Sequence, residues 1–349
     1  MIRYLAPLVC GVLLSTIVAP KKANAQSANA QAQTHVAAAK AAAYEPGHDF
    51  TNIFELCAEP KPGRAAPAEA VAPAGPRKVP PRSQWYTEPG KVFDNVYYVG
   101  TALGDNATAW AITTSEGIIL IDATWDYSVE ELIVNGFKKL GLDPAQIKYV
   151  IVAVAKPQIF GGARLLQDRY KAHVLLSEAD WNVIEKGNFS PDIKPKKDMI
   201  VTDGQKLTLG DVTVTLYVTP GNTPGTLSAI ISPIKDGNQK HVAAFYGGRA
   251  PFVNGDGVQY FPNEVAAMRI WGEQAKRFKE NAEKAGADVF LASHVGIDKT
   301  LDKVNAVKFR KPGGAHPFVS KTAVSRAQTV IYECMQAQLA WRSGNSSNN

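Results

Sequence analysis

The stretch from Tyr149 to Gln167, "YVIVAVAKPQIFGGARLLQ", is the feature that most constrains the fold. It overlaps the run Ile147–Ala155, which is apolar except for Lys148 and is followed by a short loop, the pair Gly161-Gly162 and the helical pattern "ARLLQDRY". A strand that is apolar along nearly its whole length is typical of a sheet covered by helices on both faces. The stretch therefore predicts an α/β protein, with the loop at the place where such proteins present functional side chains.

Strands and helices are predicted to alternate along much of the remaining chain, which indicates a layered α/β architecture. Further strands are expected at residues 92–100, twice within 106–126, and at 172–177, 211–219, 226–233, 241–248 and 288–293. Helices are expected at residues 126–142, ending at Gly141, and at 163–170, 177–187, 263–285 and 321–342.

The first 25 residues have the pattern of a secretory signal peptide: Arg3, a mostly apolar run at Tyr4–Pro20 and the A-x-A cleavage sequence Ala23-Asn24-Ala25. The apolar run is too short, and too interrupted by Pro and Gly, to predict a membrane span. Cleavage after Ala25 predicts a periplasmic or secreted protein. It removes three basic residues and no acid, so the formal net charge falls from +6 to +3. This weak charge, without a Lys/Arg run, gives little support for nucleic-acid binding.

The segment Gln26–Gln84 is rich in Ala, Pro, Lys and Gly. It is expected to form a flexible or extended arm, because such a composition buries little apolar surface. Within it, "HDFTNIFELC" at His48–Cys57 is more apolar and is expected to dock on the body. The predicted organisation is a signal peptide at 1–25, the arm at 26–84, the folded domain at 85–318, and a C-terminal helix and tail at 319–349.

Two cysteines, Cys57 and Cys334, remain after removal of the signal segment, which carries Cys10. In an oxidising compartment they can form a disulfide that ties the arm to the C-terminal helix. Two separate free thiols are the alternative, because the sequence gives no distance between the two residues.

Four stretches of the chain resemble the metallo-β-lactamase superfamily, and in particular its exported, subclass B3-like members: "GIILIDATWD", "GGARLLQ", "VTPGNTPGTLS" and "DVFLASH". The resemblance extends from about Val92 to Lys303. It implies an αββα sandwich, in which two sheets pack face to face between outer helices and a metal site lies at one sheet edge. It also implies a site for one or two zinc ions, which activate water for hydrolysis.

The family's ligand motif H-x-H-x-D-H precedes a Gly-Gly pair, and aligning that pair with Gly161-Gly162 identifies the residues that replace the ligands. The family's further ligands are the His of T-P-G-H-T-P-G and a residue at the end of the last strand. In this chain the six positions are, in order, Val154, Lys156, Gln158, Ile159, Asn222 and His294. Of these six positions, only 294 still carries a residue of a metal-binding type, a histidine.

The replacements remove the donor atoms and the charge that zinc requires. Val154 and Ile159 have no lone pairs, and the amide oxygens of Gln158 and Asn222 suit hard ions better than zinc. Lys156 is an ammonium at neutral pH, since its reference pKa is about 10.4. One unit charge at about 4 Å changes the free energy of cation binding by about 4 kcal/mol at an effective dielectric constant of about 20. We therefore expect no metal and no other cofactor.

Candidate pocket residues have a functional and a structural interpretation. Lys156 binds an anion or acts as a base, or, as we prefer, extends toward solvent. Tyr246 and Arg249 line the pocket and contact a substrate, or else pack on the surface. Asn222 serves as an oxyanion-hole donor or, preferably, tolerates the tight turn between two Pro-Gly steps. Asp122 is a catalytic carboxylate or, preferably, a strand-end residue that bonds loop N–H groups.

The histidines give little support for metal binding. His294 is half of a weak metal site or, preferably, a hydrogen-bonded or solvated residue at a strand end. The others show no H-x-H or H-x₃-H spacing, and so no substitute site is predicted. They are His35, His48, His173, His241 and His316.

Three functions are compatible with these patterns. The first is a metallo-β-lactamase-fold protein that has lost zinc and hydrolase activity, as a pseudoenzyme or an inactivated variant, and that keeps its cleft for a small molecule. The second, by fold analogy alone, is an exported zinc hydrolase of a β-lactam or another cyclic amide or ester. The third is a metal-independent activity or binding role that uses Lys156, Tyr246, Arg249 and His294.

Overall fold

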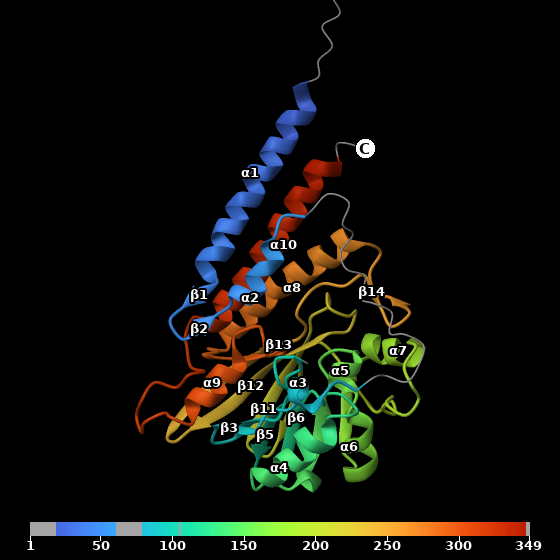
Figure 1. Cartoon of the computed structure of the whole chain (residues 1–349), viewed down its shortest axis with the longest axis vertical. Coiled ribbons are helices and arrows are strands. Elements are labelled where there is room, and N and C mark those ends of the chain that lie inside the picture. The colour runs from blue at the N-terminus through green and yellow to red at the C-terminus, as the bar shows by residue number, and fades with distance from the viewer. Residues whose placement is uncertain (1–18, 61–78, 105, 347–349) are drawn as a thin grey trace, which may run out of the picture.

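The computed structural model describes residues 19–60, 79–104 and 106–346. Two β-sheets are stacked between outer helices, with α4, α6 and α7 on one side and α8 and α10 on the other (Figure 1). The first sheet has seven strands in the order β3-β4-β5-β6-β7-β8-β9, and the second has five in the order β10-β11-β12-β13-β16. The expected αββα sandwich is confirmed.

The strands of the first sheet are β3 (Gly90–Phe93), β4 (Val96–Tyr98), β5 (Trp110–Thr114), β6 (Gly117–Ile121), β7 (Ile147–Ile151), β8 (His173–Ser177) and β9 (Met199–Val201). Those of the second sheet are β10 (Gln205–Leu209), β11 (Val212–Val218), β12 (Leu227–Asp236), β13 (Gln239–Tyr246) and β16 (Val289–Ala292). Two short hairpins are β1 (Tyr44–Glu45) with β2 (His48–Asp49), and β14 (Asn254–Gly255) with β15 (Val258–Gln259).

The helices up to β9 are α1 (Ala19–Ala42), α2 (Thr51–Phe54), η1 (Glu55–Cys57), α3 (Arg82–Trp85), η2 (Glu130–Val134), α4 (Asn135–Lys139), η3 (Pro144–Gln146), α5 (Pro157–Phe160), α6 (Ala163–Tyr170) and α7 (Glu178–Lys186). Those after β13 are α8 (Glu264–Lys284), α9 (Thr300–Val307) and α10 (Ala323–Ser346).

The apolar run Ile147–Ala155 contributes β7, a central strand of the first sheet. β7 pairs in parallel with β6 and with β8, and β8 pairs in parallel with β9. Parallel neighbours need crossover connections, which the helices between these strands supply. α6 contacts β7 and β8, so Val150 and Ile151 are buried, as the continuous apolar pattern predicts.

The stretch 92–100, expected as one strand, is instead a hairpin. β3 and β4 pair antiparallel, and Phe93 lies opposite Val96 across the turn Asp94-Asn95. Asp and Asn favour such two-residue turns, which explains why the apolar pattern is interrupted there.

Two hydrophobic cores fill the layers. The larger includes alternate residues of β11, namely Val212, Val214 and Leu216, which are all buried. The second lies between the second sheet and the helices α8 and α10, and includes the fully buried Trp271 and Phe278 of α8. The period-two pattern of β11 is that of a strand with one face toward the core.

The expectation of an extended arm is wrong for residues 26–42, which belong to the helix α1. α1 lies beside α10, and both helices extend beyond the sandwich (Figure 1). Alanine has the highest intrinsic helix propensity, and its small side chain allows two helices to approach closely. Ala32 and Ala39 of α1 are fully buried for this reason. The composition correctly indicates few large apolar residues, but it does not reveal the pairing with α10.

The described residues cover only part of the N-terminal predictions. Residues 1–18, which hold most of the expected signal peptide, lie outside them, as do residues 61–78 of the expected arm. The expected cleavage sequence falls in α1. The signal peptide and export stay predictions. Within residues 19–60, 79–104 and 106–346, no helix has both the length and the apolar character needed to cross a membrane.

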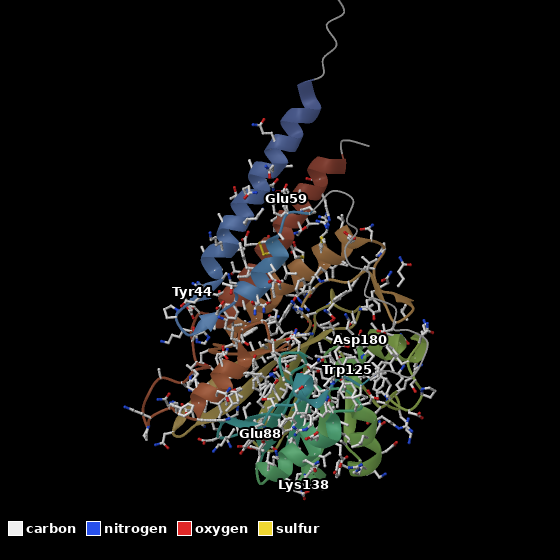
Figure 2. All side chains as sticks on the ribbon, viewed as in Figure 1. Tyr44, Glu59, Glu88, Trp125, Lys138 and Asp180 are labelled. Carbon is white, nitrogen blue, oxygen red and sulfur yellow. A yellow bond between two sulfur atoms is a disulfide. The ribbon has the colours of Figure 1, made fainter. Side chains whose placement is uncertain are left out.

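Cys57 and Cys334 form a disulfide, with 4.4 Å between their Cα atoms. Figure 2 shows it as a yellow bond between the N-terminal segment and α10. Of the two alternatives left open by the sequence, the disulfide is the one observed. Gln338 Nε2 adds hydrogen bonds to the carbonyls of Leu56 at 2.8 Å and Ala58 at 2.6 Å. These contacts fix η1 on α10.

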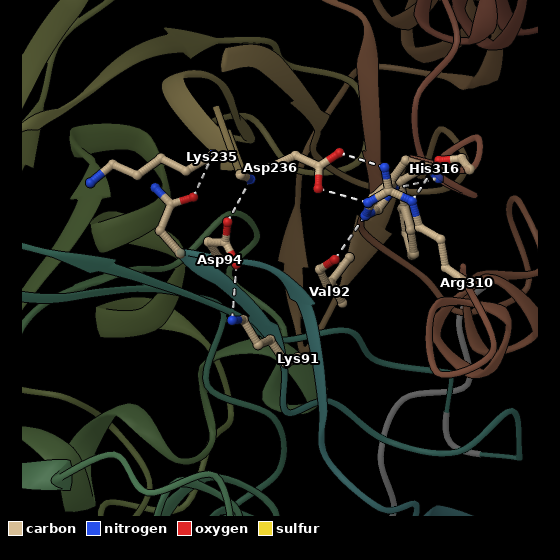
Figure 3. Close-up of polar contacts among 11 residues, drawn as sticks. Lys91, Val92, Asp94, Lys235, Asp236, Arg310 and His316 are labelled. Atoms are coloured by element: carbon tan, nitrogen blue, oxygen red, sulfur yellow. Dashed lines mark hydrogen bonds and ion pairs between the residues drawn. The ribbon is translucent and has the colours of Figure 1, made fainter. Parts of the chain in front are cut away.

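Polar contacts join the two sheets beside the β3–β4 turn (Figure 3). The carboxylate of Asp236, at the end of β12, accepts hydrogen bonds from both terminal nitrogens of Arg310, at 2.7 and 2.8 Å. His316 Nε2 donates to the carbonyl of Val92 at 2.9 Å. The strand registers place this turn at the end of the first sheet opposite to the loop after β7. The polar contacts around the β3–β4 turn therefore do not hold the loop after β7, which has separate contacts of its own.

Candidate functional site

A pocket of about 550 Å³ lies where β7 ends. It is lined by all six positions that align with the family's metal ligands: Val154, Lys156, Gln158, Ile159, Asn222 and His294. Other walls come from the loop 249–252, from Asn106 and from residues 52–56 of α2 and η1. The structure therefore brings together, from three separate loops, the residues that the sequence alignment assigns to one site.

Asp122, directly after β6, holds the start of the loop that follows β7. Its Oδ1 accepts a hydrogen bond from the Ala153 N–H at 2.8 Å, and its own N–H donates to the carbonyl of Ile151 at 2.8 Å. The carboxyl group is fully buried, and burial raises its pKa well above the ordinary value. Asp122 is not among the residues that line the pocket. Its contacts match the strand-end interpretation.

Asp180, which the sequence analysis did not single out, joins the two loops that form the pocket. Its Oδ2 accepts hydrogen bonds from the Ala155 N–H at 2.9 Å and from Thr223 Oγ1 at 2.7 Å. Its Oδ1 accepts one from the Gly225 N–H at 2.8 Å. Figure 2 marks its position on α7. The sequence offers one signal, since Asp180 lies three residues after the N-cap Ser177. An acidic residue at that position is usually explained by capping of the helix N-terminus.

Gly225 is required at this junction. A Cβ atom there would lie 1.9 Å from Ser177 Oγ and 2.6 Å from the Asp180 N–H nitrogen. Ser177 Oγ also donates to the Gly225 carbonyl at 2.8 Å. The glycines of "TPGNTPG" therefore include one that is fixed by close packing against α7, independent of any metal.

Asp180 gives the protein a testable pH dependence. Burial raises the pKa of Asp180 to about 6. The three hydrogen bonds lower the pKa, but their effect is smaller than that of burial. Because the unfolded value is about 3.9, the folded state binds the proton more tightly. This contribution to stability is complete below about pH 4 and is lost as the pH rises through 6. We expect the stability advantage of the wild type over Asp180→Asn, measured by urea unfolding, to fall by about 2–3 kcal/mol from pH 4 to pH 7.

Asp168→Asn is the matched control for this experiment. Asp168 is an exposed aspartate whose pKa is lowered by hydrogen bonds from Arg164 and Lys196. Its contribution therefore has the opposite sign and is lost as the pH falls. A pH-independent difference between the wild type and Asp180→Asn would contradict the assignment of Asp180.

Two cationic side chains line the pocket. Lys156 is only 3% exposed, and its Nζ lies 3.4 Å from the ring centroid of Phe252, at cation–π distance. The preferred expectation that Lys156 extends toward solvent is therefore wrong, because the loop 249–252 covers it. Arg249 belongs to that loop and is exposed at the rim. Of the two alternatives for Arg249, lining the pocket is the one observed.

His294 stays a neutral imidazole in this surrounding. Burial lowers its pKa to about 3, and the positive charges of Arg249 and then Lys156 add to the effect. Its Nδ1 lies 3.2 Å from Ser293 Oγ. His294 is thus a hydrogen-bonded residue at a strand end, with its other edge available to the pocket.

Asn222 lies at the pocket wall, in the bend between the two Pro-Gly steps. The left-handed conformation in this turn belongs to Gly221, with φ of 144°. Asn222 Nδ2 instead donates to the carbonyl of Ala250 at 2.8 Å, while Oδ1 is buried without a hydrogen-bond partner among the described residues. Asn222 thus lies in the turn without itself adopting a left-handed conformation, and its side chain links the loops 219–226 and 249–252.

Tyr246 lies away from the pocket, in the second core. Its hydroxyl donates to the carbonyl of Trp271 at 3.3 Å, and its ring contacts Phe278. Burial raises its pKa. Neither alternative from the sequence, pocket contact or surface packing, describes this position, because β13 directs Tyr246 toward α8 rather than toward the other sheet.

The donor atoms in the pocket do not fit zinc. The lining has one neutral imidazole and, on the N-terminal wall, the carboxylate of Glu55, beside amide groups, hydrocarbon and two cations, whereas catalytic zinc sites have three protein ligands of the imidazole, thiolate or carboxylate type. Among the described residues, no three His, Cys, Asp or Glu side chains are grouped so that they could hold a metal ion. Gln158 and Asn222 suit neither the charge nor the softness of zinc.

No family model matches the sequence. Solved structures with the same fold include the Rm3 metallo-β-lactamase, at 23% identity and a TM-score of 0.60 over 74% of this chain and 96% of that one. BJP-1, a subclass B3 metallo-β-lactamase of Bradyrhizobium japonicum, is 24% identical, with a TM-score of 0.58 over 76% of this chain and 98% of that one. A Cronobacter sakazakii metallo-β-lactamase with a HARLDQ motif is 24% identical, with a TM-score of 0.58 over 80% of this chain and 98% of that one. At these identities the likeness establishes the fold.

Proposed function

We propose that this chain, which has the metallo-β-lactamase fold, does not bind zinc, has no zinc hydrolase activity and holds a small molecule in the pocket instead. The observation that carries the proposal is the convergence of the six ligand positions on one pocket in which five of them carry hydrocarbon, amide or ammonium groups. On this proposal the protein is a pseudoenzyme or an inactivated variant of a hydrolase.

The reactive groups near the pocket support the same proposal. Hydrolysis without a metal needs another nucleophile or base, and residues 153–159 contain no Ser, Cys or His. Gln158 occupies the position of the family's aspartate, and an amide does not accept a proton at neutral pH. His294 alone is a poor base, because its pKa of about 3 makes it weakly basic.

Export is part of the proposal, since the N-terminal pattern predicts a signal peptide. The disulfide between Cys57 and Cys334 supports it, because such bonds persist in oxidising compartments. The alternative, an exported zinc hydrolase acting on a β-lactam or another cyclic amide or ester, has the support of the fold but not of the residues in the pocket.

Zinc content and turnover test the proposal directly. We expect the protein, purified without chelator and then dialysed against micromolar zinc, to contain far less than one zinc ion per chain. We expect EDTA to leave its melting temperature unchanged, because no metal contributes to the folded state. A chromogenic cephalosporin and a lactone should be hydrolysed no faster than in buffer. Stoichiometric zinc together with chelator-sensitive turnover would establish the alternative.

A further inference from the structure

The pocket combines positive charge with an apolar wall. Arg249 lies at its rim and makes no hydrogen bond or ion pair with any described residue, so its five N–H donors face solvent. Lys156 adds a second positive charge, and both cations act on His294. Among the described lining residues, the acidic one is Glu55, on the opposite, N-terminal wall. The guanidinium fork of Arg249 matches the planar geometry of a carboxylate.

Asn222 provides an independent indication of a ligand. It is 2% exposed, and its Nδ2 is already used by the Ala250 carbonyl. Its Oδ1 is buried without a partner among the described residues, although buried polar atoms are nearly always hydrogen-bonded. Gly248 packs against Asn222, since a Cβ at that glycine would lie 2.5 Å from the Asn222 Cβ. The amide is therefore held in place, with an acceptor that needs an N–H or O–H donor.

The remaining lining is mostly apolar. Ile53 and Leu56 come from the segment that the disulfide fixes, and Val154, Ile159 and Phe252 come from the body. A volume of about 550 Å³ is within the range of small-molecule sites. Inorganic phosphate or sulfate would leave these apolar surfaces uncovered, whereas an organic acid with an apolar body would bury them.

We infer that the pocket binds an organic carboxylate that has an apolar body and an N–H or O–H donor close to the carboxylate. Arg249 binds the carboxylate, Asn222 Oδ1 accepts the hydrogen bond from the donor, and the apolar wall covers the body of the ligand. The inference rests on the proposed function, because a bound zinc ion would supply a different anion-binding group.

Three related probes separate these features: N-acetylphenylalanine, its methyl ester, and 3-phenylpropanoate, which lacks the N–H donor. Each is titrated calorimetrically into the full chain in EDTA. We expect N-acetylphenylalanine to bind with a Kd below about 1 mM. It has about 15 non-hydrogen atoms, and ligands of this kind gain about 0.3 kcal/mol of binding free energy per atom. We expect the ester and 3-phenylpropanoate to bind at least about tenfold more weakly, since each lacks one polar contact.

Variants assign these differences to residues. Arg249→Gln should weaken the acid about tenfold and leave the ester unchanged. Arg269→Gln, an exposed arginine of α8 outside the pocket, is the matched control and should leave all three affinities unchanged. Asn222→Leu should remove the preference for N-acetylphenylalanine over 3-phenylpropanoate. Because it also removes the bond to Ala250, its folding is checked by circular dichroism, and Arg249→Gln decides the outcome if Asn222→Leu does not fold.

The results that overturn the inference are distinct from those that overturn the proposed function. Zinc-free protein that binds none of the probes, or that binds acid and ester equally, contradicts the inference and leaves the proposed function intact. Stoichiometric zinc in the same samples contradicts the proposed function. Binding that Arg269→Gln weakens as much as Arg249→Gln does would mean that the acid responds to overall charge and not to this pocket.

Discussion

Replacing both Cys57 and Cys334 by serine is expected to lower the free energy of unfolding by about 5 kcal/mol. The disulfide joins residues 277 positions apart, so it closes almost the whole folded chain into one loop. A cross-link over a loop of this length removes much of the conformational entropy of the unfolded chain, and the stabilisation grows with the logarithm of loop length. Denaturant unfolding of the oxidised wild type and the double variant measures the difference.

The same double variant should also loosen one wall of the pocket. Ile53, Glu55 and Leu56 belong to the segment that the disulfide fixes to α10. Without the bond, Gln338 and the hydrogen bond from Asn52 Nδ2 to the Gly296 carbonyl at 2.5 Å continue to hold this segment. We expect proteolysis within residues 43–60 to become faster than in the wild type.

Gln338→Ala is the control for this result, because it removes two hydrogen bonds of the same segment and leaves the disulfide intact. It should lower stability by about 1–2 kcal/mol. A double cysteine variant as stable as the wild type would show that the disulfide does not constrain the unfolded chain in solution.

The parts of the fold that the sequence predicts are those whose pattern depends on local geometry. The run that forms β7 and the helix that begins after Gly162 both appear directly in the order of apolar residues. Gly161 and Gly162 have no room for a side chain: a Cβ at Gly161 would lie 2.6 Å from the Asp126 N–H nitrogen, and one at Gly162 would lie 2.3 Å from the Ala123 carbonyl oxygen. These contacts explain why a glycine pair was a reliable reference for locating the six pocket positions.

The features that the sequence did not predict depend on contacts between distant residues. α1 is stabilised by α10, from the other end of the chain, and no pattern within residues 26–42 indicates that partner. Asp180 bonds Ala155 and Gly225 through backbone N–H groups, which exist at every non-proline position and leave no trace in residue type. Lys156 was expected in solvent because the position of Phe252 above it depends on tertiary packing.

The supports of the pocket are separate from the side chains that line it. Asp122, Asp180 and Gly225 hold the loops through backbone hydrogen bonds and close packing, and none of the three lines the pocket. The residues at the six ligand positions can therefore change while the loops keep their arrangement. If the proposed function holds, this separation explains how the fold and the pocket persist without the groups that bind zinc, and it predicts that a zinc site can be created by changing those side chains alone.

Restoring the five replaced ligands together should create a zinc site in one step. The variant is Val154→His, Lys156→His, Gln158→Asp, Ile159→His and Asn222→His, with His294 retained. It supplies five imidazoles and a carboxylate where one imidazole was present, and it removes the Lys156 charge. We expect zinc affinity to rise by more than about a thousandfold, since removing one unit charge near a cation contributes several kcal/mol even before new ligands are counted. Equilibrium dialysis against zinc measures the change.

The stability of the restored variant gives a second measurement. Val154 and Ile159 are each 1% exposed, so histidines there bury polar groups that lack partners until zinc binds. We expect the zinc-free variant to melt below the wild type and zinc to raise its melting temperature, which EDTA should then reverse. The matched control carries the other four substitutions and keeps Lys156, whose ammonium should prevent most of the zinc uptake. Equal zinc binding by the two variants would mean that Lys156 does not lie where the cation binds.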